Sequence, residues 1–148
     1  MDHPIGRCRA RNPARYWRAV NGFDFKKPVN TIVLVGPHGQ VVCELCQIAD
    51  GFFRRGRGLL GRTDLPRGQG MLIRPTWSVH TAFMRFAIDV VFLDEELTVL
   101  KIARRLRSWR AAARWRAHSA LELPAGECER LGIDVGDRLA WGSLEPER

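Results

Sequence analysis

A run of strongly β-forming residues near the middle of the chain, Ile88-Asp89-Val90-Val91-Phe92-Leu93, places the strongest constraint on the fold. It is rich in β-branched and aromatic side chains, which favour a strand. The acidic residues 94–96 predict a turn, and the apolar run 97–103 predicts the returning partner of a hairpin. The same signals predict further strands, with a turn at 36–39 between the first two, at residues 31–35, 41–48, 71–73, 118–123 and 137–141.

Helical segments are few and short in the predicted fold. Asp50 is a candidate cap for a helix that Gly61 ends, and residues 125–131 predict a second helix. Residues 104–117 are expected to form an exposed connection that contains a short strand near Trp109. Because hairpins join most of the strands, we predict an α+β fold: a β-rich compact domain whose antiparallel or mixed sheet curls into a barrel-like core, with two or three short helices.

The net charge of +8 is concentrated at the N-terminus. Residues 1–28 hold seven basic and two acidic side chains, whereas the other 120 residues hold 17 basic and 14 acidic ones. We therefore expect three parts: a basic N-terminal arm at 1–28, itself a candidate for a short helix, a single β-rich domain at 29–143, and a tail at 144–148. Nucleic-acid binding through the arm is one hypothesis, although a basic arm is more often a solvated tail.

The sequence also bears on location and cofactors. No stretch approaches the roughly 20 apolar residues of a membrane span, and the N-terminus lacks the apolar core of an export signal. A cytoplasmic protein without a membrane partner is therefore expected. The fingerprints of phosphate-binding and dinucleotide-binding loops are missing as well, so we expect no cofactor.

The cysteines show one motif spacing, Cys43-Glu44-Leu45-Cys46. It falls in a predicted strand, where residues three apart point to opposite faces, so the two thiols are not expected to share a metal ion. The second cysteine pair that a structural zinc site needs is missing, and the four histidines lie in separate segments. We expect buried thiols and no bound metal.

Three candidate polar residues can be assigned to faces by strand alternation. If residues 79–94 form one unbroken strand, His80 lies on one face and both Arg85 and Asp89 lie on the other. A carboxylate among apolar neighbours needs a partner. Backbone amides or an arginine fork are the favoured partners of Asp89, and an acid-base pair with His80 is the alternative, which the alternation disfavours. Glu122, in a later strand, is interpreted as part of a solvated face, with a ligand-facing wall as the alternative.

Exposed tryptophan and arginine together are typical of binding hot spots, although ordinary core packing is the favoured interpretation of the tryptophans. The first hypothesis for the function is a non-enzymatic module that holds an unidentified small molecule or protein partner in a cleft. Its candidate ligand-binding residues are Arg74, Trp77, His80, Arg85 and Asp89, with Arg62 and Glu122 as further candidates. The alternative is a hydrolase-type enzyme that uses Asp89 with His80 or Glu122.

Several ordered blocks run between about residue 31 and residue 141. They are Arg57-Gly58-Leu59-Leu60-Gly61-Arg62, Gly70-Met71-Leu72-Ile73, Phe83-Met84-Arg85, Ile88-Asp89-Val90-Val91-Phe92-Leu93-Asp94, Leu121-Glu122-Leu123, Ala125-Gly126 and Gly136-Asp137. In order and spacing these blocks resemble the domain of unknown function 192 family, an uncharacterised protein family. The resemblance implies a compact β-rich α+β domain, and it implies no established catalytic residue, cofactor or substrate. The N-terminal arm falls outside it.

Overall fold

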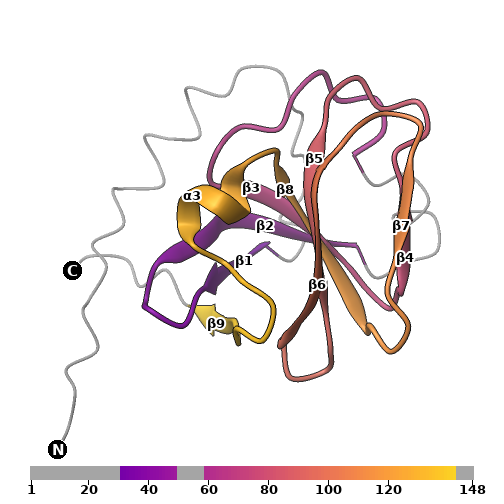
Figure 1. The fold of residues 1–148 in the computed structure, drawn as a ribbon. Helices are drawn as coiled ribbons and strands as arrows, with labels where there is room; N and C mark the ends of the chain where they lie inside the picture. The colour runs from indigo at the N-terminus through magenta and orange to yellow at the C-terminus, as the bar shows by residue number, and fades with distance from the viewer. Residues whose placement is uncertain (1–30, 50–58, 143–148) are drawn as a thin grey trace, which may run out of the picture.

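The structure is a computed structural model that describes residues 31–49 and 59–142 (Figure 1). Its strands are β1 (Thr31–Val35), β2 (Val41–Ala49), β3 (Gln69–Ile73), β4 (Ser78–His80), β5 (Ile88–Leu93), β6 (Val99–Leu106), β7 (Ala111–Ala113), β8 (Ser119–Pro124) and β9 (Ala140–Gly142). One helix lies in these ranges, α3 (Glu127–Leu131), and none there is long and apolar enough to cross a membrane. The predicted arm, the tail and most of the helix expected between residues 50 and 60 lie outside the described residues.

Seven strands form one mixed sheet in the order β6-β5-β8-β3-β2-β1-β9, while β4 and β7 pair as a separate two-stranded ribbon. β2 and β3 run parallel, and the other paired strands run antiparallel. The prediction of a β-rich domain with a mixed sheet is therefore confirmed. The sheet curls (Figure 1), but β6 and β9 at its ends are not neighbours in a ladder. An isolated bridge between Thr98 and Arg138, with a few backbone hydrogen bonds around it, links the segments at the starts of these two strands, but no continuous ladder closes the described strands into a barrel.

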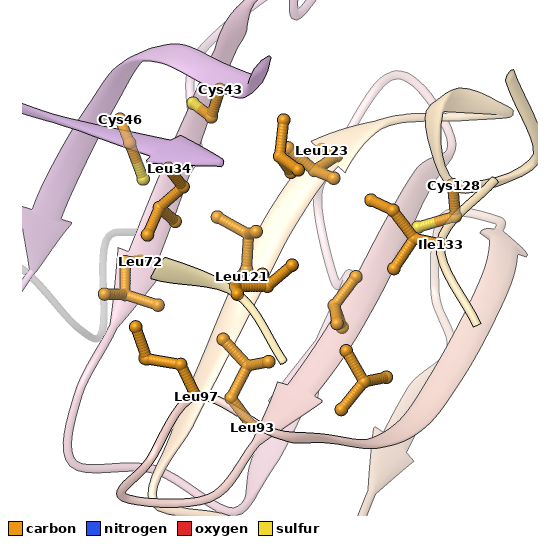
Figure 2. Packing of buried hydrophobic residues seen from close by; sticks show 14 residues of the cluster. Leu34, Cys43, Cys46, Leu72, Leu93, Leu97, Leu121, Leu123, Cys128 and Ile133 are labelled. Carbon is orange, nitrogen blue, oxygen red and sulfur yellow. The ribbon is translucent and has the colours of Figure 1, made fainter. Parts of the chain in front are cut away.

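Both faces of the sheet are buried, which creates two hydrophobic cores. One face packs against α3, and the other packs against the β4–β7 ribbon; in Figure 1 these two elements lie on opposite sides of β5 and β6. The helix-side core (Figure 2) contains Leu34, Val42, Cys43, Cys46, Leu72, Val91, Leu93, Leu97, Val99, Leu121, Leu123, Cys128, Ile133 and Leu139. The ribbon-side core contains Ala49, Leu59, Leu65, Met71, Ile73, Val79, Met84, Ile88, Val90, Phe92 and Ala120. Strand alternation therefore sorts β5 and β8 cleanly between the two cores.

The strand predicted across residues 79–94 is interrupted, because β4 ends early and β5 begins only at Ile88. Thr81 fixes the loop between them: it is fully buried, and its hydroxyl accepts the Arg110 amide at 3.0 Å. Phe83 then takes a left-handed φ of 63°, which lies far from the φ of a strand. The unbroken strand is therefore a wrong prediction, and alternation applies only from Ile88 onward.

The cysteine pair lies on a β-bulge of β2. One residue of β1 faces two residues of β2, and the amides of Glu44 and Leu45 both donate to the Gly68 carbonyl, at 2.8 and 2.9 Å. The bulge turns Cys43 and Cys46 into the same helix-side core, where both are fully buried (Figure 2). The prediction of opposite faces is therefore wrong, and that of buried thiols is confirmed. The hydrogen bond with Cys43, and then burial, raise the pKa of the Cys46 thiol well above its ordinary value.

Candidate functional site

The β4–β7 ribbon presents small side chains to solvent. Its antiparallel register pairs Ser78 with Ala113, Val79 with Ala112 and His80 with Ala111. Val79 turns into the ribbon-side core, whereas Ser78 and His80 on β4, and Ala111 and Ala113 on β7, are exposed. Because Ala111 and Ala113 have small side chains, they do not obstruct the approach of a ligand to the outer face of the ribbon.

Four large aromatic side chains precede and follow the two strands of the ribbon. Their exposed fractions are 55% for Trp77, 72% for Phe83, 60% for Trp109 and 74% for Trp115. The rings of Phe83 and Trp109 contact one another, with centroids 4.5 Å apart and planes inclined by 60°. The register of the ribbon places Trp77 and Trp115 at one end and Phe83 and Trp109 at the other, and exposed apolar side chains of this size make the ribbon a candidate interaction site.

The turns that carry these rings hold strained backbone. Phe83, Trp109 and Arg116 adopt φ values of 63°, 59° and 70°, in the left-handed region that side chains other than glycine rarely occupy. The Trp109 amide donates to the Thr81 carbonyl at 3.0 Å, which ties its turn to the loop after β4. Strain of this kind persists only where the surrounding structure fixes it, and it gathers at functional sites.

The segments that build the ribbon contain basic residues and no acidic ones. Residues 74–87 and 101–118 together include nine basic side chains: Arg74, Arg85, Lys101, Arg104, Arg105, Arg107, Arg110, Arg114 and Arg116. Arg104 and Arg105 pair with Asp134 and Glu129. The other six arginines form no ion pair with a described residue, and all of them except Arg74 are exposed. A surface of one charge sign attracts ligands of the opposite sign.

We call the combined feature the ribbon surface. It consists of Trp77, His80, Phe83, Arg85, Arg107, Trp109, Arg110, Arg114, Trp115 and Arg116. Three of the candidate residues expected from the sequence belong to it, namely Trp77, His80 and Arg85. Arg74 lies at its margin, half-buried between β3 and β4, and its amide donates to the Ala49 carbonyl at 3.0 Å.

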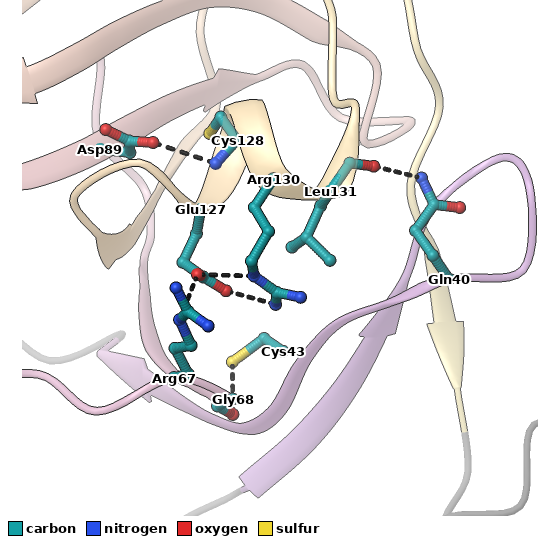
Figure 3. A network of polar contacts seen from close by, with 9 residues as sticks. All are labelled: Gln40, Cys43, Arg67, Gly68, Asp89, Glu127, Cys128, Arg130 and Leu131. Carbon is teal, nitrogen blue, oxygen red and sulfur yellow. Dashed lines mark hydrogen bonds and ion pairs between the residues drawn. The ribbon is translucent and has the colours of Figure 1, made fainter.

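Asp89 is separated from the ribbon surface and lies fully buried on the helix side of the sheet. Its Oδ1 accepts the Arg105 amide at 2.8 Å, and its Oδ2 accepts the Cys128 amide at 3.0 Å (Figure 3). Arg105 lies where β6 has one extra residue against β5, and Cys128 lies in the first turn of α3, where amides lack helical partners. The carboxylate therefore joins β5, β6 and α3. The interpretation of Asp89 as an anchor for backbone amides is confirmed.

Glu122 is buried on the opposite face of the sheet, in the layer of the ribbon-side core. The register places it between Met71 of β3 and Val90 of β5, and only 3% of it is exposed. The predicted solvated face is therefore wrong, because β8 is covered on both sides. Burial raises the pKa of the Glu122 carboxyl to about 8, and the nearby Arg62 charge opposes this shift only in part.

Arg62 is an electrostatic neighbour of this carboxyl and is itself bound to Gln47. The Arg62 Nη2 donates to Gln47 Oε1 at 3.0 Å, and Gln47 pairs with Met71, which pairs in turn with Glu122. Burial lowers the pKa of Arg62, while the charge of Glu122 raises it. Glu122 Oε2 has no hydrogen-bond partner among the described residues. Two further candidates from the sequence are thus electrostatic neighbours: Glu122 is buried inside the domain, and Arg62 is half-buried.

The residues expected to carry a hydrolase reaction do not converge. Asp89 and Glu122 lie on opposite faces of the sheet, and His80 is exposed on β4. An acid and a base must come within hydrogen-bond reach to act together. The thiol nearest to Asp89 is also a poor nucleophile, because burial, and then the Asp89 charge, raise the pKa of Cys128 to about 12.

Several residues of the ribbon surface were not recognised as candidates from the sequence. Phe83, Trp109, Arg110 and Trp115 are not among the candidates that the sequence predicts, although both of these tryptophans lie next to arginines. The usable signal was the absence of acidic residues from 101 to 118. Pairing of β7 with the distant β4 is what gathers these side chains at one place.

The comparison with known proteins now identifies the domain. A family model, DUF192, described as uncharacterized ACR, matches residues 34–141. The chain belongs to the DUF192 family. A UPF0127 protein of Thermococcus sibiricus is 33% identical over 115 residues, which cover 74% of this chain and 73% of that protein. A UPF0127 protein of Pyrococcus furiosus is 38% identical over 104 residues, which cover 66% of this chain and 87% of that protein.

Solved structures share the DUF192 fold. A protein of unknown function from Novosphingobium aromaticivorans matches with a TM-score of 0.66 at 23% identity, covering 78% of this chain and 90% of that chain. A protein from Sinorhizobium meliloti, described as a candidate transcription regulator, matches with a TM-score of 0.66 at 23% identity, covering 74% and 91%. Such low identity shows the fold alone. The DUF192 match includes α3 and the whole ribbon surface and excludes residues 1–33.

Proposed function

We propose that this DUF192 domain is a non-enzymatic binding module and that the ribbon surface binds an anionic ligand. The observation that carries the proposal is the combination of four exposed aromatic rings with exposed arginines in two segments that contain no acidic residue. Arginine and tryptophan dominate the energetics of binding sites, because both combine a large contact area with directed polar or π interactions. The proposal rests on the ribbon and not on the arm at residues 1–28.

The spacing of the charges favours a ligand that carries more than one anionic group. Arg110 and Arg114 lie on either side of β7, about 13 Å apart at the rise of roughly 3.3 Å per residue of a strand. This is a backbone separation, so the guanidinium groups at the ends of the two exposed side chains can each contact a separate anionic group of one ligand. Because these side chains are exposed, the attraction is screened by salt, and affinity should fall as the salt concentration rises.

Binding to inorganic polyphosphate tests this proposal directly. We expect the full chain to bind at low salt, and we expect the Arg110→Ala/Arg114→Ala variant to bind roughly tenfold more weakly, since two exposed charge contacts contribute about 0.5–1 kcal/mol each. The measurement is isothermal titration calorimetry at two salt concentrations.

The matched control is Arg104→Ala/Arg105→Ala, which removes the same charge from exposed arginines that pair beside α3. Its affinity should stay close to that of the unaltered chain. Equal weakening in both double variants would show that net charge, and not the ribbon surface, is responsible. Failure of the unaltered chain to bind polyphosphate at low salt would reject the proposal.

A further inference from the structure

The ribbon surface repeats one pairing of side chains, a flat ring beside a cation. Trp109 is followed by Arg110, and Trp115 lies between Arg114 and Arg116. A ligand that matches this pattern must repeat a flat group and an anionic group along its length. Nucleic acid has this chemistry, because each nucleotide supplies a base and a phosphate, whereas an acidic peptide supplies the charge without the ring.

Exposure of the rings favours a single strand over a duplex. In a duplex the base faces are covered by their neighbours, so protein rings cannot stack on them. In a single strand the base faces are open, and stacking on an aromatic side chain contributes to binding whatever the base. The four rings of the ribbon surface are each more than half exposed, and the outward alanines of β7 leave room between them.

The Phe83 and Trp109 part of the ribbon surface is held in place without a ligand. The Phe83 and Trp109 rings already contact one another, and the buried Thr81 holds both of their turns. Its hydroxyl donates to the Arg107 carbonyl at 2.6 Å and accepts the Arg110 amide, while its carbonyl accepts the Trp109 amide. Rings that are fixed in advance lose little conformational freedom on binding, which favours affinity.

Resting on the proposed function, we propose that the ligand of the ribbon surface is single-stranded nucleic acid. Its bases stack on Trp109 with Phe83, and on Trp115, while its phosphates pair with Arg110 and Arg114. Because every base has a flat face, recognition of this kind has little dependence on sequence. Salt weakens the phosphate contacts much more than the stacking.

The central comparison is between two single-stranded oligomers of equal length and charge, one with bases and one without. Fluorescence anisotropy is measured for the full chain with labelled 20-nucleotide oligothymidylate, an abasic oligomer of the same length, the corresponding duplex and polyglutamate. We expect oligothymidylate to bind at least tenfold more tightly than the abasic oligomer, since each stacked base adds roughly tenfold or more. Binding of the duplex and of polyglutamate should be weaker than binding of oligothymidylate.

Two tryptophan variants separate stacking from charge. Trp109→Ala and Trp115→Ala should each weaken oligothymidylate binding roughly tenfold while leaving abasic binding unchanged. Trp141→Ala is the matched control, because Trp141 is 50% exposed on β9, outside the ribbon surface, and its loss should change neither affinity. Thermal melting of each variant confirms that it is folded.

The possible failures are distinguishable. Equal affinity for oligothymidylate and the abasic oligomer would overturn the nucleic-acid inference while leaving anion binding intact. Tighter binding of the duplex or of polyglutamate would likewise overturn it in favour of another class of ligand. No binding of any of the four, nor of polyphosphate, would reject the proposed function itself.

Discussion

Replacing Asp89 with alanine is expected to lower the free energy of unfolding by roughly 3–5 kcal/mol, since each buried donor left without an acceptor costs about 1–3 kcal/mol. The variant leaves two amides, those of Arg105 and Cys128, without the carboxylate that accepts them. Asp89→Asn should have an intermediate effect, because its side-chain oxygen can accept only one of the two amides and its NH₂ group faces the other. Urea denaturation monitored by circular dichroism measures the difference.

Asp94→Ala is the control for this prediction. Asp94 also accepts two amides, those of Glu96 at 3.0 Å and Thr98 at 2.8 Å, but it is only half-buried. Water can replace the lost acceptor there, so we expect a loss of about 1 kcal/mol. A loss below this value for Asp89→Ala, accompanied by lost polyphosphate binding, would contradict its role as an anchor and would place it in the binding site.

Glu122→Gln is expected to change how stability depends on pH. Burial raises the pKa of this carboxyl from its ordinary 4.5 to about 8, so the folded protein holds a proton that the unfolded chain releases. The stability that this proton confers is fully present below about pH 4.5 and is lost as the pH rises toward 8. The total loss is roughly 5 kcal/mol, since each pKa unit corresponds to about 1.4 kcal/mol.

Glutamine cannot release the proton and has nearly the same shape. The variant and the unaltered protein should therefore be similar in stability near pH 5, and the variant should be more stable by several kcal/mol at pH 8.5. Urea denaturation at pH 5, 6.5 and 8.5 provides the comparison. Glu129→Gln is the control, because Glu129 is an exposed residue of α3, and it should have little effect on the pH dependence of stability. Stability profiles of the Glu122 variant and the unaltered protein that run parallel would contradict the prediction.

Local signals in the sequence predict much of the sheet. β-Branched and aromatic residues predict β5, the acidic residues after them predict the turn, and a glycine predicts the end of α3. These preferences act within a few residues of the chain, so they can be read from the sequence. The need of Asp89 for a partner also follows from its apolar neighbours. The sequence does not predict which amides bind the carboxylate, since Cys128 lies 39 residues away and is positioned by the packing of α3.

The wrong predictions share a cause, since each concerns a feature that is determined by contacts between distant segments. The β-bulge that turns Cys43 and Cys46 to one face forms because two amides of β2 share the carbonyl of Gly68, and composition does not reveal such sharing. Glu122 is buried because elements cover both faces of β8. The ribbon surface likewise exists only because β4 pairs with β7. The sequence contains its side chains but does not reveal that they lie close together.

The claim that the ribbon surface is the binding site is tested most directly by NMR of the isotope-labelled full chain. Polyphosphate is titrated into the protein, and the indole N–H signals of the five tryptophans are followed together with the backbone amides. The account predicts shifts for the indoles of Trp109 and Trp115 and for the amides of residues 109–116, with Trp141 unchanged. Shifts confined to residues 1–28, or to α3 and Trp141, would contradict it.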